Sequence, residues 1–418
     1  MQSNIAIIKL MVLVLLAAFT QACSKKEPKD HNPKNDDLEV LNAKDVQKTK
    51  SMGLWAHYMP WFEDKASSGT GNWGMHWTMA NRNPDLLHAD GKRQIAAHYY
   101  PLIGPYASND RDVLEYHFLL MKYAGIDGIW IDWYGTRDLH DYPLNLRNTE
   151  IIVDVIKKVG LKYAIVYEDQ TLRDDLSTDG QRMAQAIADM RYMQSHFFND
   201  EAYFRQDGKP VLLTFGPQML TSPSTWSMVL GSIPVKPVFY TLYGHSERAH
   251  NEAHPNTAGE FLWVDATSME DKYAHRPAGG TLLGGAYPGF HDYYREGGWG
   301  DQVLSPIAHE QGDLFDQLLK MAAAKNVAHL QLITWNDFGE GTMIEPTEEF
   351  GFTFLETLQR FSGVSYDQKT LESIWQYYKL KKTYAKDPVK QRQLLQAFYY
   401  YIALQEDKAM AIINTLKK

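Results

Sequence analysis

The stretch Gln331–Pro346, QLITWNDFGEGTMIEP, is the part of the sequence that decides the fold and the site. It begins inside an apolar run, Leu330–Thr334, and changes at Trp335 to a polar turn that contains glycine. Such a pattern is typical of a buried strand that opens into a loop. Asp337 and Glu340 lie three residues apart on the expected loop, and carboxylates placed in this way indicate acid–base chemistry.

Seven earlier apolar runs resemble this one, and most of them end in polar residues or glycine. The eight runs are Leu54–Trp61, Gly128–Tyr134, Tyr163–Tyr167, Val211–Phe215, Pro237–Leu242, Phe261–Val264, Leu282–Tyr287 and Leu330–Trp335. Helical spacing lies between several of them, over Asp110–Ala124, Asn148–Val159, Asp179–Phe197 and Glu310–Lys325. Strands that alternate with helices predict a (β/α)8 TIM barrel over residues 51–363. The alternative, an open doubly wound sheet, needs a phosphate-binding first turn, for which the sequence offers no convincing candidate.

The sequence after the eighth run predicts helices and no further strand. Phe350–Phe361 is expected to be the last helix of the barrel, and Leu371–Tyr384 and Val389–Leu416 two further helices with Pro388 near their junction. We therefore predict that residues 364–418 form a C-terminal helical extension whose aromatic side chains pack on the barrel. A role for these rings in binding a partner protein is the alternative.

The N-terminus has the features of a targeting segment. Lys9 is followed by the apolar run Leu10–Phe19 and then by Thr20–Cys23, which resembles a bacterial lipoprotein signal with a loose match at Thr20. The resemblance implies cleavage of residues 1–22, a lipid on Cys23, and a place in the bacterial cell envelope with the lipid as the only membrane contact. Plain secretion is the alternative. Residues 23–50 are polar and charged, and predict a flexible tether.

Composition narrows the class of partner. The chain has 418 residues and a formal net charge of −9, which argues against a nucleic-acid partner and is compatible with a neutral glycan. Aromatic residues make up 13%, which suits both a large core and the stacking of rings on sugars. We expect a monomer.

The predicted strand ends share one kind of chemistry, because aromatic rings alternate there with carboxylates and imidazoles. In a barrel of this class, functional residues lie at the C-terminal ends of the strands. We expect an oligosaccharide or polysaccharide to bind there, since rings stack on sugars and carboxylates hold hydroxyl groups and move protons. The predicted substrate-binding residues are His57, Tyr58, Trp61, Trp73, Trp77, Asp132, Trp133, Glu168, Tyr287, His291, Trp335 and Asn336.

Two short motifs resemble known binding motifs but lack the spacing or the neighbouring helix that those motifs need. Gly69–Gly74 matches a dinucleotide-binding fingerprint, but no helix pattern follows it. His250–His254 has its glutamate one place away from a zinc-binding HExxH motif. We therefore expect no metal and no cofactor.

The motif WNDFGEGTMIEP resembles the eighth-strand motif of glycoside hydrolase family 99, the endo-α-mannosidases and endo-α-mannanases, whose pattern is roughly N-E-W-H-E-G-T-x-I-E-P. The segments HYMPWF, GNWGMHW and YPGFHD are similar to that family as well. By position, Asp337 replaces a glutamate of the family and Gly339 a histidine. The sequence Asn-Asp-aromatic-Gly-Glu is closer to family 71, the α-1,3-glucanases, so the chain resembles a 71/99-like group.

This resemblance implies a glycoside hydrolase that acts on an α-linked glycan, with an α-mannan-like substrate as the first expectation. It assigns the general acid/base to Glu340 and the base, acting on water or on the sugar's 2-hydroxyl group, to Asp337. It also matches Glu168 to an acidic residue near the cleaved sugar. The alternative is a glycan-binding lipoprotein on a degenerate barrel without catalytic activity.

Overall fold

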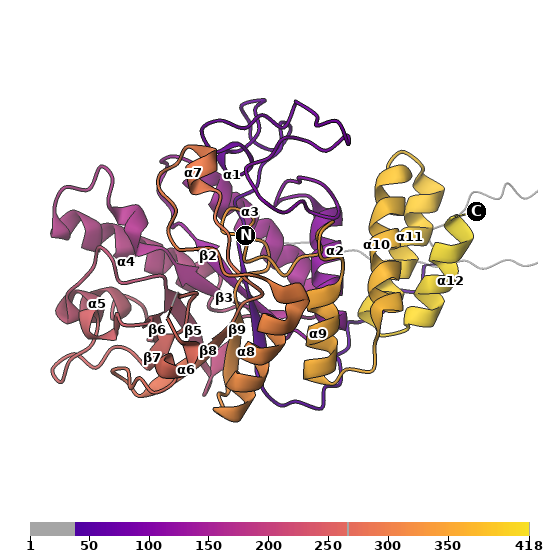
Figure 1. Ribbon diagram of the computed structural model, residues 1–418. Coiled ribbons are helices and arrows are strands. Elements are labelled where there is room, and N and C mark those ends of the chain that lie inside the picture. Colours follow the sequence, from indigo (N-terminus) through magenta and orange to yellow (C-terminus); the bar gives the residue numbers. More distant parts are fainter. Residues whose placement is uncertain (1–37, 266, 418) are drawn as a thin grey trace, which may run out of the picture. The chain divides into compact units, whose positions relative to one another are not determined.

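The computed structural model describes residues 38–265 and 267–417 (Figure 1). The predicted signal peptide and the lipidation site Cys23 lie outside the described residues and stay predictions. Within the described part, eight parallel strands form the centre of the fold: β1 (Gly53–Tyr58), β2 (Gly128–Trp133), β3 (Lys162–Tyr167), β5 (Lys209–Thr214), β6 (Val238–Leu242), β7 (Gly259–Phe261), β8 (Thr281–Ala286) and β9 (His329–Leu332).

Strand pairing closes these eight strands into a barrel. The hydrogen-bonded order runs from β3 through β2 and β1 to β9, β8, β7, β6 and β5, and β5 pairs with β3. The predicted TIM barrel is therefore confirmed. The short strand β4 (Arg205–Gln206) pairs antiparallel with β5 across Asp207-Gly208, where both residues have a positive φ. A two-residue Asp-Gly turn of this kind is typical of a tight hairpin.

Helices fill the connections between the strands. They are α1 (Met75–Thr78), α2 (Arg111–Tyr123), α3 (Tyr142–Val159), α4 (Asp179–His196), α5 (Pro223–Leu230), α6 (Met269–Lys272), α7 (Tyr294–Gly297), α8 (Asp313–Ala324) and α9 (Thr353–Ser362). Local sequence sets several of their ends. Thr178 and Gln181 form a capping box at the start of α4, and Gly160 ends α3 in the left-handed conformation with φ 82°.

Several element boundaries differ from the sequence predictions. Helix α3 begins at Tyr142 rather than Asn148, because Pro143 fits the first turn of a helix, where no backbone donor is needed. Strand β7 covers Gly259–Phe261, and the residues after it belong to a loop. The last predicted helix is in fact two, α11 (Pro388–Ile402) and α12 (Glu406–Leu416), which separate where Leu404 has φ 58°.

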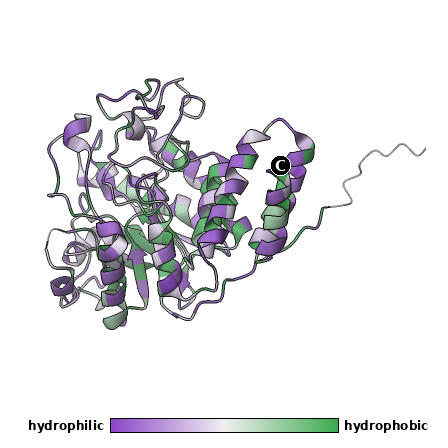
Figure 2. Ribbon diagram, turned by 45° about the vertical axis from the view of Figure 1, so that its right-hand side comes forward, coloured by the Kyte–Doolittle hydropathy of each residue, from purple (hydrophilic) through white to green (hydrophobic). Residues whose placement is uncertain are grey.

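The C-terminal helices α10 (Gln368–Thr383), α11 and α12 lie together beside the barrel helix α2 (Figure 1). The Tyr377 hydroxyl donates a hydrogen bond of 2.5 Å to Glu115 on α2, and the Tyr123 hydroxyl donates one of 2.9 Å to the carbonyl of Tyr401. Their ribbons mix hydrophobic and hydrophilic residues (Figure 2), as expected for helices that bury one face.

Residues 38–50 differ from the flexible tether that the sequence predicts. They form no helix or strand, but their backbone is held by hydrogen bonds from Lys44 N to the carbonyl of Ile402 and from Thr49 N to the carbonyl of Ser362. Lys48 also forms an ion pair of 2.5 Å with Asp127. This part of the predicted tether is therefore fixed to the barrel and to its C-terminal helices.

Residues 38–265 and 267–417 lack two kinds of feature. None of their helices is long and apolar enough to cross a membrane. None of their groups of His, Cys, Asp and Glu side chains is arranged to hold a metal ion.

Candidate active site

A cavity of about 470 Å³ lies at the C-terminal ends of the barrel strands. Loops from both halves of the chain contribute to its wall, because the barrel brings the ends of all its strands to one mouth. The lining residues are His57, Met59, Trp61, Phe62, His76, Met79, Asp132, Tyr134, Glu168, Gln170, Phe215, Trp263, Tyr294, Trp299, Asp301, Val303, Asp337, Gly339 and Glu340. Six of the predicted site residues are among them: His57, Trp61, Asp132, Glu168, Asp337 and Glu340.

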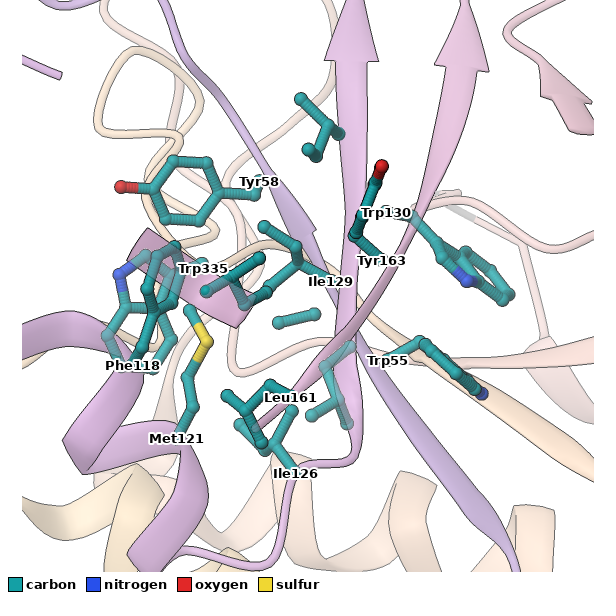
Figure 3. Packing of buried hydrophobic residues seen from close by; sticks show 14 of the residues in the cluster. Trp55, Tyr58, Phe118, Met121, Ile126, Ile129, Trp130, Leu161, Tyr163 and Trp335 are labelled. Carbon is teal, nitrogen blue, oxygen red and sulfur yellow. The ribbon is translucent and has the colours of Figure 1, made fainter. Parts of the chain in front are cut away.

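Strand geometry decides which residues of a strand end reach the cavity. Side chains alternate between the two faces of a strand, so only every second residue points into the barrel. His57 and Asp132 therefore line the cavity, while Tyr58 and Trp133 point outward. The Tyr58 hydroxyl lies 3.0 Å from His117 Nδ1 on α2. Figure 3 shows Tyr58 and Trp335 near Phe118 and Met121, among the buried side chains that fill the space between the barrel and α2.

The predictions for Tyr58, Trp133 and six further residues as direct substrate contacts are not supported by their positions. Trp73, Trp77, Tyr287, His291, Trp335 and Asn336 are the other residues that do not line the cavity. Trp77 is fully buried and donates a hydrogen bond of 2.8 Å to the carbonyl of Tyr106, and Trp73 donates one of 3.1 Å to Asp85. The ring of His291 stacks on His98 with a centroid distance of 3.6 Å.

Asp337 and Glu340 share one tight turn after β9. Asp337 Oδ1 accepts a hydrogen bond of 2.8 Å from the backbone N–H of Glu340, and the backbone N–H of Asp337 donates one of 2.8 Å to Thr334 Oγ1. The Tyr294 hydroxyl donates a hydrogen bond of 3.2 Å to Glu340 Oε1. These contacts fix the turn, so the direction of both carboxyl groups is set before a ligand binds.

Burial changes the protonation of the acidic groups in the cavity. Burial raises the pKa of Asp337 to about 6, although the backbone N–H of Glu340 and the charge of His76 lower it. Burial and the negative charge of Asp337 raise the pKa of Glu340 well above its usual value. The charge of Asp337 thus favours the protonated form of Glu340, which is the order of acidity that a base and an acid need.

A second pair of carboxyl groups, Asp132 and Glu168, lies on the ends of β2 and β3. Burial raises the pKa of both, and the charge of Asp337 adds to the effect on Asp132, as that of Asp132 does on Glu168. Asp132 Oδ1, Glu168 Oε2 and Glu340 Oε2 are buried and have no hydrogen-bond partner among the described residues. Buried polar atoms are normally paired, so these three oxygens are available to the hydroxyl groups of a ligand.

Aromatic rings and imidazoles cover one side of the cavity. Trp61 stacks on His76 at 4.2 Å with an angle of 4° between the rings, and Trp299 meets His76 edge-on at 5.6 Å. Trp263 packs edge-on against His57, and burial lowers the pKa of His57 to about 3, so this imidazole is neutral. Flat faces beside hydrogen-bonding groups suit sugar rings.

Several lining residues were missed by the sequence analysis. Tyr134 follows Asp132 by two positions, so the period of a strand could have identified it. Tyr294, Trp299 and Asp301 lie in the long connection between β8 and α8, which carries no periodic pattern. Only the folded chain brings that connection to the mouth of the barrel.

A buried network holds the turn from behind. Asn336 accepts a hydrogen bond of 2.8 Å from the backbone of Met59 and donates one of 3.1 Å to the Tyr106 hydroxyl, which itself donates one of 2.7 Å to Glu345. Glu345 Oε1 lies 3.2 Å from His117 Nε2, and both side chains are fully buried. Asn336 and Glu345 thus act on the site through its backbone and not by contact with a ligand.

The fold and the site together define a (β/α)8 barrel with a carboxylate-rich, aromatic-walled mouth, the arrangement that is typical of glycoside hydrolases. The family model described as Glycosyl hydrolase family 99 matches residues 51–241, so the chain is similar to glycoside hydrolases of that family. The matched range contains His57, Asp132 and Glu168, and ends before the turn with Asp337 and Glu340. The resemblance to family 99 that the sequence predicts is confirmed.

Curated relatives and a solved structure are similar to large parts of this chain. Glycoprotein endo-alpha-1,2-mannosidase of Xenopus laevis is 23% identical over 265 residues, which are 59% of this chain and 51% of the relative. The Rattus norvegicus protein of the same name is 28% identical over 166 residues, 37% of this chain and 33% of the relative. The chain thus spans about half the length of the first of these relatives. The GH99 endo-alpha-mannosidase structure from Bacteroides thetaiotaomicron has a TM-score of 0.57 at 17% identity, with 75% of this chain and 96% of that chain covered, and shares the fold.

Proposed function

We propose that the protein is a glycoside hydrolase that cleaves an α-linked glycan, with an α-mannan-like oligosaccharide or polysaccharide as substrate. Glu340 is the general acid and Asp337 is the base. The observation that carries the proposal is the pair of carboxyl groups on one turn, both facing one cavity, with their pKa values separated by burial and mutual charge.

The reaction needs one proton donor and one proton acceptor. Glu340 gives its proton to the glycosidic oxygen as the bond between that oxygen and the anomeric carbon breaks. Asp337 takes a proton from water, whose oxygen forms the new bond to the anomeric carbon, or from the sugar's 2-hydroxyl group, whose oxygen then displaces the leaving group and closes a 1,2-anhydro ring. In the second route the Glu340 carboxylate takes a proton from water, the water oxygen opens the ring at the anomeric carbon, and Asp337 returns its proton to the 2-oxygen. Asp132 and Glu168 accept hydrogen bonds from the hydroxyl groups of the sugar, because one buried oxygen of each, Asp132 Oδ1 and Glu168 Oε2, has no protein partner among the described residues.

The choice of an α-mannan-like substrate rests on the similarity to endo-alpha-mannosidases and on the charge of the cavity. Among the described residues, five Asp or Glu side chains and no Lys or Arg line it. A sugar unit with a negative charge would be repelled at the point of cleavage, whereas neutral mannose would not.

The decisive experiment is a turnover assay with α-mannan and α-glucan oligosaccharides, followed by NMR that resolves the anomers of the product. The parent chain is expected to release shorter oligosaccharides, and Glu340→Gln to lower the rate by about 10²–10⁴-fold, the usual contribution of a general acid. Glu372→Gln, an exposed change on α10, is the matched control and should keep the parent rate.

Glycan binding without catalysis is the alternative that this assay separates. Binding of these oligosaccharides without turnover, undiminished in Asp337→Asn, would favour it. Turnover that is equally fast in Glu340→Gln and the parent would show that another group is the acid.

A further inference from the structure

A second cavity of about 370 Å³ lies close to the candidate active site. Its lining comes from the long connection between β1 and α2, from Tyr293 and from Glu349, and consists of Arg82, His88, Lys92, Arg93, Gln94, Ile95, Ala97, His98, Tyr99, Tyr100, Tyr293 and Glu349. We call it the basic pocket, because three of these residues are Lys or Arg and one is a carboxylate.

Two of the three cations, Arg82 and Arg93, form no direct ion pair among the described residues, although the charge of Arg93 helps to lower the pKa of the nearby Asp85 carboxyl group. Lys92 is paired with Glu348 at 2.7 Å. Arg82 donates through Nε to the Tyr293 hydroxyl at 2.8 Å and lies over that ring, and Arg93 donates to the carbonyl of Pro84 at 2.7 Å. Neither guanidinium has a carboxylate within ion-pair distance among residues 38–265 and 267–417.

The negative charge of Glu349 acts on Lys92 and Tyr99 and not on the two arginines. One of its carboxylate oxygens accepts a hydrogen bond of 3.0 Å from the backbone N–H of Tyr100, and its side chain is exposed. The tyrosine rings and the half-buried guanidinium groups make a concave surface in which a charged ligand is partly shielded from water, where charge-assisted hydrogen bonds are strong.

A short part of the chain separates the basic pocket from the cavity of the candidate active site, which we call the acidic cavity because five carboxyl groups line it. Tyr293 lines the first and the next residue, Tyr294, lines the second. Likewise, Met79 lines the active-site cavity, and Arg82, three residues later, lines the basic pocket. The backbone of this part of the chain is fixed to the carboxylate turn, since Tyr293 N donates to the carbonyl of Gly339 at 2.8 Å and His291 N to that of Glu340 at 2.8 Å.

We propose that the basic pocket binds a negatively charged substituent, a phosphate, sulfate or carboxylate group, on a sugar unit next to the unit held in the active site. This inference rests on the proposed function and adds an anionic glycan to it. Arg82 and Arg93 hold the anion, and the tyrosine rings contact the sugar that carries it. The acidic cavity thus accepts a neutral sugar unit, and the basic pocket accepts the charged sugar unit next to it.

The test is calorimetric titration of the full chain in its Glu340→Gln form with mannose 6-phosphate, mannose 6-sulfate, glucuronic acid and neutral mannose as probes. At least one anionic probe should bind about tenfold tighter than mannose or more, as expected for charge-assisted bonds to guanidinium groups. The affinity should fall as salt is added, and the comparison of the three anions identifies the preferred group.

Arg82→Gln/Arg93→Gln should remove the advantage of the anionic probes. Arg295→Gln, an exposed arginine on α7 outside the basic pocket, is the matched control and should keep it. Circular dichroism of each variant checks that it is folded. Arg93→Lys, which keeps the charge, should retain part of the advantage if the double variant is unstable.

Equal affinities for mannose and all three anions, or an advantage that survives in the folded double variant, would overturn the inference. Binding is measured in a chain that lacks the proposed acid, so the result does not depend on turnover. A chain without hydrolytic activity that still prefers the anionic probes would contradict the proposed function and leave the basic pocket in place.

Discussion

Single charges next to the carboxylate turn set its protonation. The His76 ring stacks on Trp61, and its Nε2 lies 3.2 Å from Asp141 Oδ2, so its position beside the cavity is fixed from two sides. Its positive charge lowers the pKa of Asp337, against the effect of burial. His76 is therefore a positioning residue that tunes the base through the electric field and not through contact with it.

Replacement of His76 by glutamine should move the acid limb of the pH profile. The parent is expected to lose kcat/KM below pH about 6, where Asp337 takes up a proton. Without the imidazolium, the pKa of Asp337 rises and the limb moves to higher pH. The measurement is kcat/KM between pH 4 and 9, with His196→Gln, exposed on α4, as control. An unchanged limb in His76→Gln would contradict this role.

Glu345 contributes to stability from a place that no ligand reaches. Its contact with His117 and the bond from Tyr106 are fully buried, and a buried polar group that loses its partner typically costs about 1–3 kcal/mol. Urea unfolding of Glu345→Gln should show a loss of this size, while the exposed control Glu372→Gln should stay within about 0.5 kcal/mol of the parent. A loss no greater than that of the control would mean that the pair does not stabilise the fold.

Strands and helices are the features that the sequence predicts well. The apolar runs identified all eight barrel strands, because a strand buried on both faces needs them. The sequence does not show which of two neighbours at a strand end points into the barrel. It therefore predicts His57 together with its outward neighbour Tyr58, and Asp132 together with Trp133. The wall formed by Tyr294 and Trp299 could not be predicted, since it depends on how one long connection folds over the barrel.

Close contact between β2 and β3 gives a test of the barrel itself. A Cβ atom at Gly128 would lie 2.1 Å from the carbonyl oxygen of Lys162, which is backbone and cannot turn away. Gly128→Ala should therefore destabilise the protein by at least about 1–3 kcal/mol, the usual cost of overpacking. Gly180→Ala on α4, where the nearest atom lies 4.0 Å away, is the matched control and should not destabilise. Equal urea midpoints for both variants would contradict this account.

The collection of buried acids at the barrel mouth has a cost in stability for the complete fold. Glu168 has a pKa above its unfolded value, so the folded chain binds its proton more tightly than the unfolded chain does. The contribution of Glu168 to stability consequently falls as pH rises above its unfolded pKa, and is most favourable in acid. A site of this kind is retained for function and not for stability.

Glu168→Gln should accordingly be more stable than the parent at pH 8, and the difference should shrink toward pH 5. Urea midpoints at the two pH values measure this, with Glu372→Gln as the exposed control that shows no such trend. A difference between parent and variant that is the same at both pH values would mean that Glu168 is not desolvated.

Trp299 gives the protein a natural optical signal. Its side chain is 39% exposed at the rim of the cavity, between Gly298 and Gly300, and its ring lies against His76. A ligand that covers this ring changes its contact with water, and with it the indole emission. The difference in fluorescence between the parent and Trp299→Phe would then report occupancy of the mouth directly, with no labelled sugar and no turnover.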